Sequence, residues 1–174
     1  SYFEISGYPA GPDGSHGFSC WNDPQVAEYL VARTQDYVSQ LPMFSGIVLD
    51  GPDHKWEIAP GERDDLFAGQ CDCDHCQNAA HSMGLELMKL IDALAAFKLE
   101  LQQLNDEKVE GFLTSTRGFL GAADWWLSHP ELLDLLRFRY TTIEDHLKRE
   151  YDGIKRHLPD FTVMASARTP AYSA

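Results

Sequence analysis

The feature that most constrains this chain is a run of three cysteines within six residues, Cys71, Cys73 and Cys76, spaced Cys-x-Cys-x-x-Cys. Cys73 and Cys76 stand where we predict a helix to begin, at about Asp74, and a helix N-terminus favours thiolate over thiol. Thiolate is the form of cysteine that binds soft divalent metals. Cys71 and Cys73 are too close in sequence to bridge each other without strain. The run therefore favours a metal site over a local disulfide.

A tetrahedral zinc site needs a fourth ligand, and the only other cysteine in the chain is Cys20. Cys20 follows the first predicted strand, and the cysteine run follows the second. Loops that follow parallel strands emerge at the same edge of a sheet, so Cys20 is within reach of the run. We predict a structural zinc bound by Cys20, Cys71, Cys73 and Cys76. His75 is an alternative ligand, and the competing interpretations are four reduced cysteines or a disulfide from Cys20 to the run.

Apolar strands alternate with amphipathic helices along the chain, which indicates an α/β fold. We predict strands over 2–6, 46–49 and 161–165, and helices that begin near residues 23, 74, 87 and 128. Asn22 or Asp23 can cap the first helix, with Pro24 in its first turn, and Gly84 is expected to break or kink the helix that begins near Asp74. Residues 109–127 are ambiguous. Strands separated by long helices pair in parallel through right-handed crossovers. Three such strands fit a doubly wound sheet or part of a (β/α)8 (TIM) barrel.

Two local patterns give sharper predictions. The continuous apolar run 46–49 is typical of a strand that is buried on both faces. The sequence Ser128-His129-Pro130-Glu131 predicts a capping box at the start of the last helix. The apolar spacing of that helix predicts a buried face made of Leu132, Leu136, Tyr140, Ile143, Leu147, Ile154 and Leu158.

The length of 174 residues gives room for one domain. A complete (β/α)8 barrel needs about 250 residues, so three strand units amount to part of one. The chain starts and stops close to predicted strands and lacks an initiator Met, which we interpret as the ends of an internal piece. We therefore expect a single partial TIM-barrel domain over 1–174, with a cysteine-rich insertion at about 51–127.

The charge balance restricts the partners that this chain is expected to have. It carries 14 Lys and Arg against 27 Asp and Glu, a net charge of −13. Nucleic acids and anionic membranes bind basic surfaces, so we expect neither as a partner. No apolar run approaches the roughly 18 residues of a membrane span. Four cysteines are too few for a disulfide scaffold, which favours the cytoplasm over secretion and leaves the compartment open.

The residues around the cysteines resemble a known family. The segment Gly17–Pro24, which contains Cys20, is similar to the segment that supplies the first zinc cysteine in the β-galactosidases of glycoside hydrolase family 42. The run Cys71-x-Cys73-x-x-Cys76 resembles the other three ligands, and the stretch from His129 to the last strand resembles the next barrel unit. The resemblance implies a (β/α)8 glycosidase barrel whose zinc stabilises loops near the active-site mouth.

The chain departs from that family at the catalytic acid. The family carries an Asn-Glu pair after the strand equivalent to 47–49, whereas this chain reads Asp50-Gly51-Pro52-Asp53. Glycoside hydrolysis needs two carboxyl groups, one of them with a raised pKa. We predict Asp53, or alternatively Asp50, as one catalytic carboxyl group. The substrate-binding candidates are His54, Trp56 as a sugar-stacking platform, and Arg168.

These observations lead to one functional expectation with two alternatives. We expect a glycoside hydrolase-like protein with a carbohydrate substrate and a structural zinc, and a homo-oligomer is compatible with the sequence. The first alternative is a non-catalytic carbohydrate-binding relative that has lost the acid/base Glu. The second is a metal-stabilised α/β domain without sugar chemistry.

Overall fold

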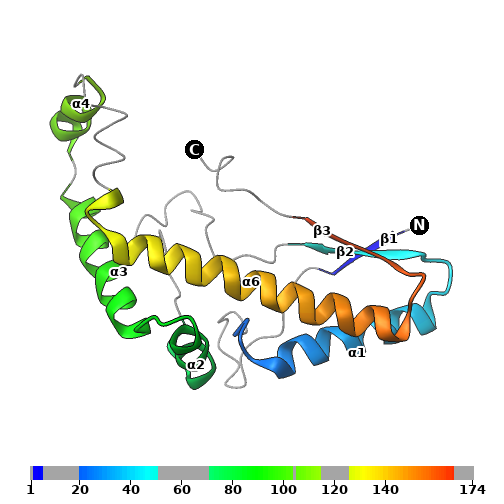
Figure 1. Ribbon diagram of the computed structural model, residues 1–174. Coiled ribbons are helices and arrows are strands. Elements are labelled where there is room, and N and C mark those ends of the chain that lie inside the picture. The colour runs from blue at the N-terminus through cyan, green and yellow to red at the C-terminus, as the bar shows by residue number, and fades with distance from the viewer. Residues whose placement is uncertain (1, 6–19, 51–70, 104, 115–125, 167–174) are drawn as a thin grey trace.

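The computed structural model describes residues 2–5, 20–50, 71–103, 105–114 and 126–166 (Figure 1). The described elements follow the order of strand, helix, strand, inserted helices, helix and strand. They are β1 (Tyr2–Ile5), α1 (Pro24–Gln40), β2 (Gly46–Asp50), α2 (Asp74–Ser82), α3 (Leu87–Gln102), α4 (Asp106–Thr114), α6 (Pro130–His157) and β3 (Thr162–Ser166). The predicted mixed α/β composition is confirmed.

The three strands form one parallel sheet in the order β1-β2-β3. The central residue Ile47 pairs with Phe3 on one side and with Val163 on the other, and Asp50 pairs with Ser166 at the carboxyl ends. Neighbouring strands in the sheet are parallel and consecutive in the chain, so each connection must run back along the sheet before the next strand begins. Helix α1 lies in the connection from β1 to β2, and α6 lies in the connection from β2 to β3. The parallel sheet and its connecting helices agree with the prediction.

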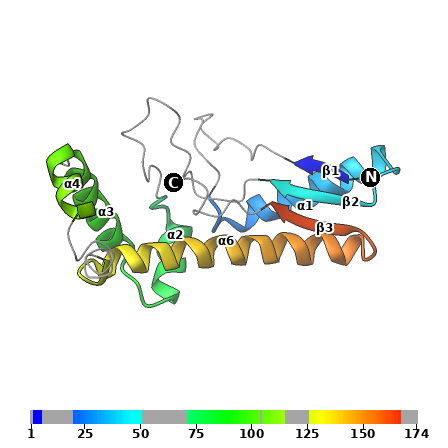
Figure 2. The same cartoon turned by 90° about the horizontal axis from the view of Figure 1, so that it is seen from above.

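Both connecting helices pack on the same face of the sheet (Figure 2). Ile47 and Leu49, which are two residues apart and so share a face of β2, are 0% and 3% exposed. They form one hydrophobic cluster with Val26 and Leu30 from α1, Ile154 from α6 and the nearby Phe161. This cluster is the core that fixes α1 and α6 against the strands.

The opposite face of the sheet is less covered, which corrects the prediction of a strand buried on both faces. Val48 is only partly buried, and its β3 partner Met164 is 39% exposed. The apolar run 46–49 does not distinguish the two cases, because Val, Ile and Leu favour any strand position that is at least half buried.

The long helix α6 extends past the strands and supports a second group of helices (Figure 1). Its N-terminal half packs against α3, and α2 packs against α3. The second hydrophobic cluster consists of Cys76, Ala80, Leu87, Leu90, Leu94, Leu135 and Phe138. The helix therefore connects two cores, one at the sheet and one beside the cysteines.

The ends of the first helices follow the predicted signals. Asp23 caps α1, since its Oδ1 accepts from the backbone N–H of Gln25 at 2.9 Å, and Pro24 occupies the first turn. Gly84 separates α2 from α3 with φ of 75°, a left-handed conformation that favours glycine. The predicted break at Gly84 is confirmed.

The predicted capping box at the start of α6 is wrong. The N-cap is His129, which makes no side-chain capping bond, and Ser128 lies one residue earlier with Oγ 3.1 Å from His129 Nδ1. Pro130 occupies the first turn, so Glu131 falls too early to close the box.

The predicted buried face of α6 is also partly wrong. Leu132 and Ile154 are buried as expected, but Tyr140 is 52% exposed. The buried positions instead include Leu135 and Phe138. They also include four polar residues, Arg139, Thr142, His146 and Glu150. Apolar periodicity cannot identify a face on which polar side chains are buried.

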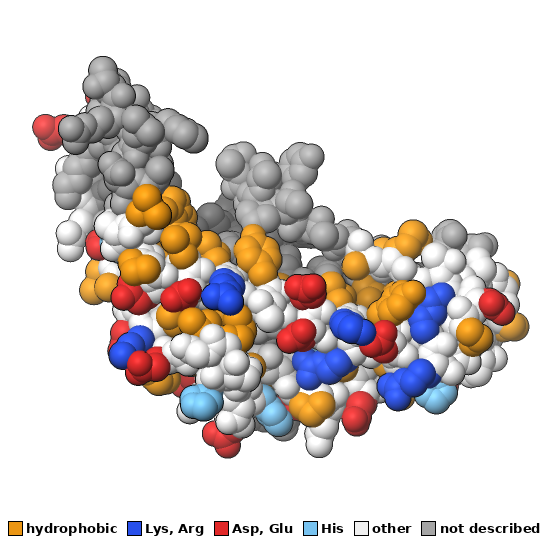
Figure 3. Space-filling model, viewed as in Figure 1, with side chains coloured by type: hydrophobic (Ala, Val, Ile, Leu, Met, Phe, Trp, Pro, Cys, Tyr) orange, Lys and Arg blue, Asp and Glu red, His pale blue; other side chains and the backbone are white. Residues whose placement is uncertain are grey.

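The surface shown in Figure 3 carries acidic and basic side chains side by side over α6, with hydrophobic side chains gathered toward both ends. Lys148 and Asp152 form one exposed ion pair on this helix. Among the described helices, none is long and apolar enough to cross a membrane.

The close approach of α1 to α6 yields a first prediction. A Cβ added at Gly153 would lie 2.5 Å from Val31 Cγ2, and a β-branched valine has little rotamer freedom in a helix. Gly153→Ala should therefore destabilise the fold by about 1–3 kcal/mol despite the better helix propensity of alanine. Chemical denaturation should show partial recovery when Val31→Ala is added.

Gly111 in α4 provides the matched control, because a Cβ added there meets no atom within 4 Å. Gly111→Ala should leave stability unchanged or raise it by about 0.5–1 kcal/mol. If both glycine variants behave alike, the α1–α6 contact is looser than described.

Candidate metal centre

The four cysteines converge into one cluster. Their Sγ atoms all lie within 4.8 Å of one another. Cys20 Sγ is 3.5 Å from Cys73 Sγ and 3.4 Å from Cys76 Sγ, and none of the four forms a disulfide. The predicted grouping of these cysteines is confirmed, and the alternative of a disulfide from Cys20 is not what the structure shows.

The spacing of the sulfurs fits a tetrahedral metal. A zinc–sulfur bond of about 2.3 Å places tetrahedral sulfurs about 3.8 Å apart. Two of the separations are 3.4 and 3.5 Å, slightly shorter than that value, and no pair of the four sulfurs is more than 4.8 Å apart. His75 is outside the four-residue group; its half-exposed ring instead faces Asp23 Oδ1 at 3.9 Å. The four sulfurs therefore supply a complete ligand set that can hold one metal ion.

Local structure positions three of the four cysteines. Cys20 opens a turn in which its carbonyl accepts from the N–H of Asp23 at 3.0 Å, directly before α1. Cys73 is the N-cap of α2, and its carbonyl accepts from the N–H of Gln77 at 2.9 Å. Cys76 lies in the first turn of α2 and is 3% exposed. The positive end of α2 thus faces the sulfurs.

Burial and hydrogen bonds within the cluster shift the pKa values of three of the thiols. Hydrogen bonds from Cys76 and Cys73 lower the pKa of Cys20 to about 5, against the opposing effect of burial. Burial raises the pKa of Cys71 to about 11. The pKa of Cys76 is also raised, because its thiol donates a hydrogen bond to Cys20 and its side chain is buried. Metal binding would therefore release protons and weaken at acid pH.

The turn that carries Cys20 is anchored on α6. The carbonyl oxygen of Trp21 accepts from Arg149 Nη2 at 2.9 Å and lies 3.3 Å from His146 Nδ1. The buried Trp21 ring meets the His146 ring edge-on, with centroids 4.6 Å apart. Asn22 Nδ2 donates to both Cys76 Sγ and Thr142 Oγ1. Cys20 is therefore positioned by tertiary contacts as well as by its own turn.

A buried acid lies beside this anchor. Glu150 and His146 are both fully buried, and Glu150 Oε2 is 3.8 Å from His146 Nε2. Within the described part of the chain, neither carboxyl oxygen of Glu150 has a hydrogen-bond partner. Burial raises the pKa of Glu150 to about 7. Burial, with a smaller contribution from the Arg149 charge, lowers the pKa of His146 to about 4.

These values imply a neutral histidine facing an acid that is largely protonated below pH 7. A carbonyl oxygen only accepts, so His146 Nδ1 carries the proton toward Trp21, and Nε2 presents its lone pair to Glu150. A protonated carboxyl group complements that lone pair, whereas a carboxylate would not.

The structure places only part of the predicted catalytic site. Asp50 ends β2 beside the carboxyl end of β3. Asp53, His54, Trp56 and Arg168 lie outside the described residues. His146, which no sequence motif marks as part of a site, is fully buried. No local sequence pattern identifies Asn22 or Glu150 as part of the site. The four-residue spacing of His146 and Glu150 predicts only that the two side chains are neighbours on one helix.

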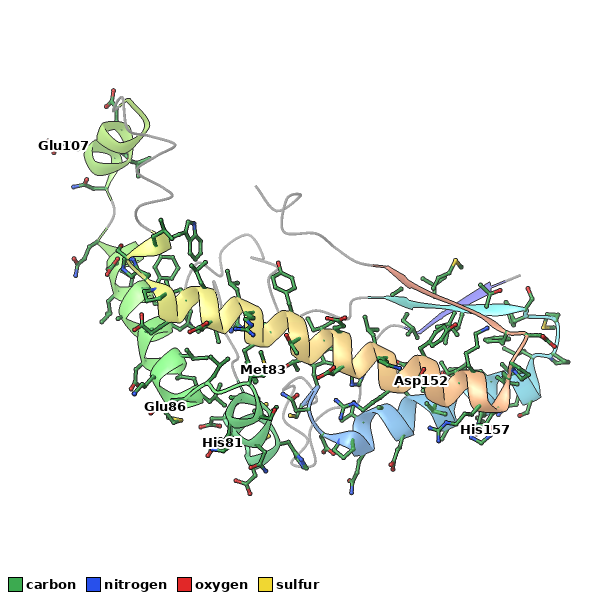
Figure 4. All side chains as sticks on the ribbon, viewed as in Figure 1. His81, Met83, Glu86, Glu107, Asp152 and His157 are labelled. Atoms are coloured by element: carbon green, nitrogen blue, oxygen red, sulfur yellow. The ribbon has the colours of Figure 1, made fainter. Side chains whose placement is uncertain are left out.

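A separate groove of about 930 Å³ runs between α1 and α6. Its lining includes Glu28, Arg149, Asp152, Arg156 and His157, and Figure 4 labels Asp152 and His157 on the C-terminal half of α6. The lining contains none of the cysteines or predicted catalytic residues. The groove is therefore distinct from the metal centre, and its mixed charges indicate no particular ligand.

Comparison with known proteins adds no relative: no family model, curated protein or solved structure matches the chain significantly. The functional argument therefore rests on the fold, the cysteine cluster and the sequence.

The buried acid yields a pH prediction. The folded-state pKa of Glu150, about 7, lies above the ordinary glutamate value of 4.5, so its contribution to stability is lost as pH rises from about 4.5 through 7. Glu150→Gln keeps the shape and removes the charge. The stability of this variant relative to the parent should rise over that window by up to about 3 kcal/mol, measured by denaturation at pH 5 and pH 8.

The variant and the parent are compared at the same pH. The pH dependence of stability that comes from His146 is present in both proteins and therefore cancels in the difference. The lowered pKa of His146 makes stability rise with pH between about 4 and 6.5. Glu144→Gln, on an exposed position of the same helix, is the control. Parallel stability curves for Glu150→Gln and the parent would show that Glu150 does not titrate as described.

Proposed function

We propose that this chain is part of a (β/α)8 glycoside hydrolase-like protein in which a structural zinc bound by Cys20, Cys71, Cys73 and Cys76 joins loops beside a carbohydrate site. The observation that carries the proposal is the convergence of Cys20 with the distant cysteine run into one four-sulfur cluster. The resemblance to the zinc-containing β-galactosidases leads us to expect this ligand set.

The chemistry of the ligands supports zinc in a structural role. A set of four cysteine sulfurs suits zinc or iron, and four cysteines are an established ligand set of structural zinc sites. Four protein ligands leave no open position for water or substrate, so the metal would hold loops together rather than activate a nucleophile. Zinc would neutralise part of the negative charge on the four thiolates, those of Cys20, Cys71, Cys73 and Cys76.

The packing of both connecting helices on one face of the sheet supports a barrel. Helices α1 and α6 cover the face that carries Ile47 and Leu49, while Met164 on the other face is 39% exposed. In a (β/α)8 barrel all helices pack outside the strands, and the inner strand faces are filled by the remaining units. The single covered face is the arrangement that three consecutive barrel units would have.

The catalytic part of the proposal follows from the position of the predicted acids. Asp50 ends β2, and Asp53 comes three residues later in the following turn. Catalytic groups of TIM barrels lie at the carboxyl ends of strands. We propose Asp53 as the general acid/base and Asp50 as its alternative, with His54, Trp56 and Arg168 contacting the sugar. The second carboxyl group would come from a strand beyond this chain.

One sequence feature favours a second candidate function. Gly51-Pro52 replaces the Asn-Glu pair that carries the family acid/base. A relative that binds carbohydrate without cleaving it would retain the barrel and the zinc while lacking turnover. Sugar binding without hydrolysis by the full-length protein would support this alternative.

The metal assignment predicts about one zinc per chain in protein prepared without chelator. Elemental analysis should detect zinc, and X-ray absorption should show four sulfur ligands at about 2.3 Å. Cys76→Ser should reduce the bound zinc sharply, while Ser82→Ala, an exposed control on the same helix, should not. Iron as the bound metal, or a disulfide between any two of the cysteines, would contradict the assignment.

The catalytic assignment predicts the effect of Asp53→Asn in the full-length protein. General acid/base catalysis contributes about 10²–10⁴ in rate, so kcat on a matching aryl glycoside should fall by that factor. Zinc content should remain at the parental value. Asp72→Asn, an exposed acid beside the cysteine cluster, is the control. Unchanged turnover in Asp53→Asn would place the acid elsewhere.

A further inference from the structure

The side chain of Asn22 lies between the cysteine cluster and helix α6. Its amide nitrogen Nδ2 donates to Cys76 Sγ at 3.3 Å and to Thr142 Oγ1 at 3.4 Å. An amide nitrogen carries two hydrogens, so both bonds can form together. Asn22 is two residues from Cys20, whereas Cys76 and Thr142 are 54 and 120 residues away. One amide thus joins three segments that are distant in sequence.

The chemistry of the sulfur fixes the orientation of this amide. A metal-bound thiolate would accept but not donate hydrogen bonds, so it would need the nitrogen of Asn22, rather than its oxygen, to face Cys76, as the structure has it. An N–H donor spreads the negative charge of the thiolate and favours its deprotonated form. Because Cys76 is 3% exposed, water cannot readily replace this donor.

Thr142 completes the arrangement from α6. Its side chain is 3% exposed, and its Oγ1 accepts the second N–H of the Asn22 amide. Residues of the same helix also hold the turn next to Asn22, because Arg149 and His146 both contact the Trp21 carbonyl oxygen. The orientation of the amide is therefore set by α6, which lies outside the ligand set.

From this geometry we infer that Asn22 is a positioning residue of the metal centre: it donates to Cys76 Sγ, is oriented by Thr142, and so couples metal binding to the docking of α6. The inference rests on the proposed zinc site and goes beyond it, because neither Asn22 nor Thr142 is a ligand. Outer-shell hydrogen bonds orient metal ligands and adjust their donor strength.

The first test measures metal affinity in the full chain. Competition with a chromophoric chelator should show that Asn22→Ala binds zinc about 10- to 100-fold more weakly than the parent, the usual effect of losing an outer-shell partner. Thr142→Val, which keeps the shape, should weaken binding by about 2- to 10-fold. Asn78→Ala and Thr141→Val change the same residue types at neighbouring positions outside the contact and should bind as the parent does.

A double variant tests whether Thr142 acts through Asn22. If it does, adding Thr142→Val to Asn22→Ala should weaken zinc binding no further, because the two residues form one path. Additive losses would show that Thr142 acts independently and would overturn the coupling. Circular dichroism of each variant confirms that α6 and the other helices are retained.

Cobalt spectroscopy gives a readout that a purely structural role would not move. Replacing zinc by Co²⁺ and removing the N–H donor should make Cys76 more electron-rich, which shifts the sulfur-to-cobalt charge-transfer band to lower energy in Asn22→Ala. The controls should keep the parental spectrum. Zinc affinity within about twofold of the parent together with an unchanged cobalt spectrum would overturn the inference while leaving the zinc site intact.

A parent protein that binds neither zinc nor cobalt would instead overturn the proposed metal centre, and the role of Asn22 with it. The two failures are therefore distinguishable from the same set of measurements.

Discussion

The contact between the Cys20–Asp23 turn and the buried polar face of α6 determines much of this structure. Trp21, Asn22 and the adjacent N-cap of α1 fix where Cys20 lies, and α6 holds that turn through Thr142, His146 and Arg149. The same helix packs on the sheet through Ile154 and on α3 through Phe138. The cysteine cluster is therefore positioned by a helix that contributes no ligand to it.

This arrangement separates two requirements. The sheet core needs apolar burial, which α1 and α6 provide over Ile47 and Leu49. The cysteine cluster needs hydrogen-bond donors and excluded water, which the Asn22 amide and the neighbouring hydrophobic cluster provide. Because α6 takes part in both, a metal bound at the cysteines would stabilise the α1–α6 pair as well as the loops. Structural metals contribute in this way to the folding free energy of the segments they join.

The buried polar residues of α6 have an energetic consequence. Glu150 lies fully buried beside a neutral His146, and a carboxyl group in that position is more stable protonated than ionised. A hydrophobic residue of similar volume would avoid this penalty. The pair instead keeps polar atoms close to the Trp21 carbonyl, where His146 helps to hold the turn that presents Cys20.

The sequence by itself determined the elements with strong local signals: three strands, the Asp23 cap, the break at Gly84, and the cysteine spacing at a helix start. These signals depend on backbone chemistry within a few residues, so they are readable without the fold. Tertiary structure alone decided which face of α6 is buried, because the buried residues Arg139, Thr142, His146 and Glu150 are polar and apolar periodicity does not mark them. It also decided that Asn22 meets Cys76 and Thr142, because hydrogen bonds between segments 54 and 120 residues apart leave no local pattern.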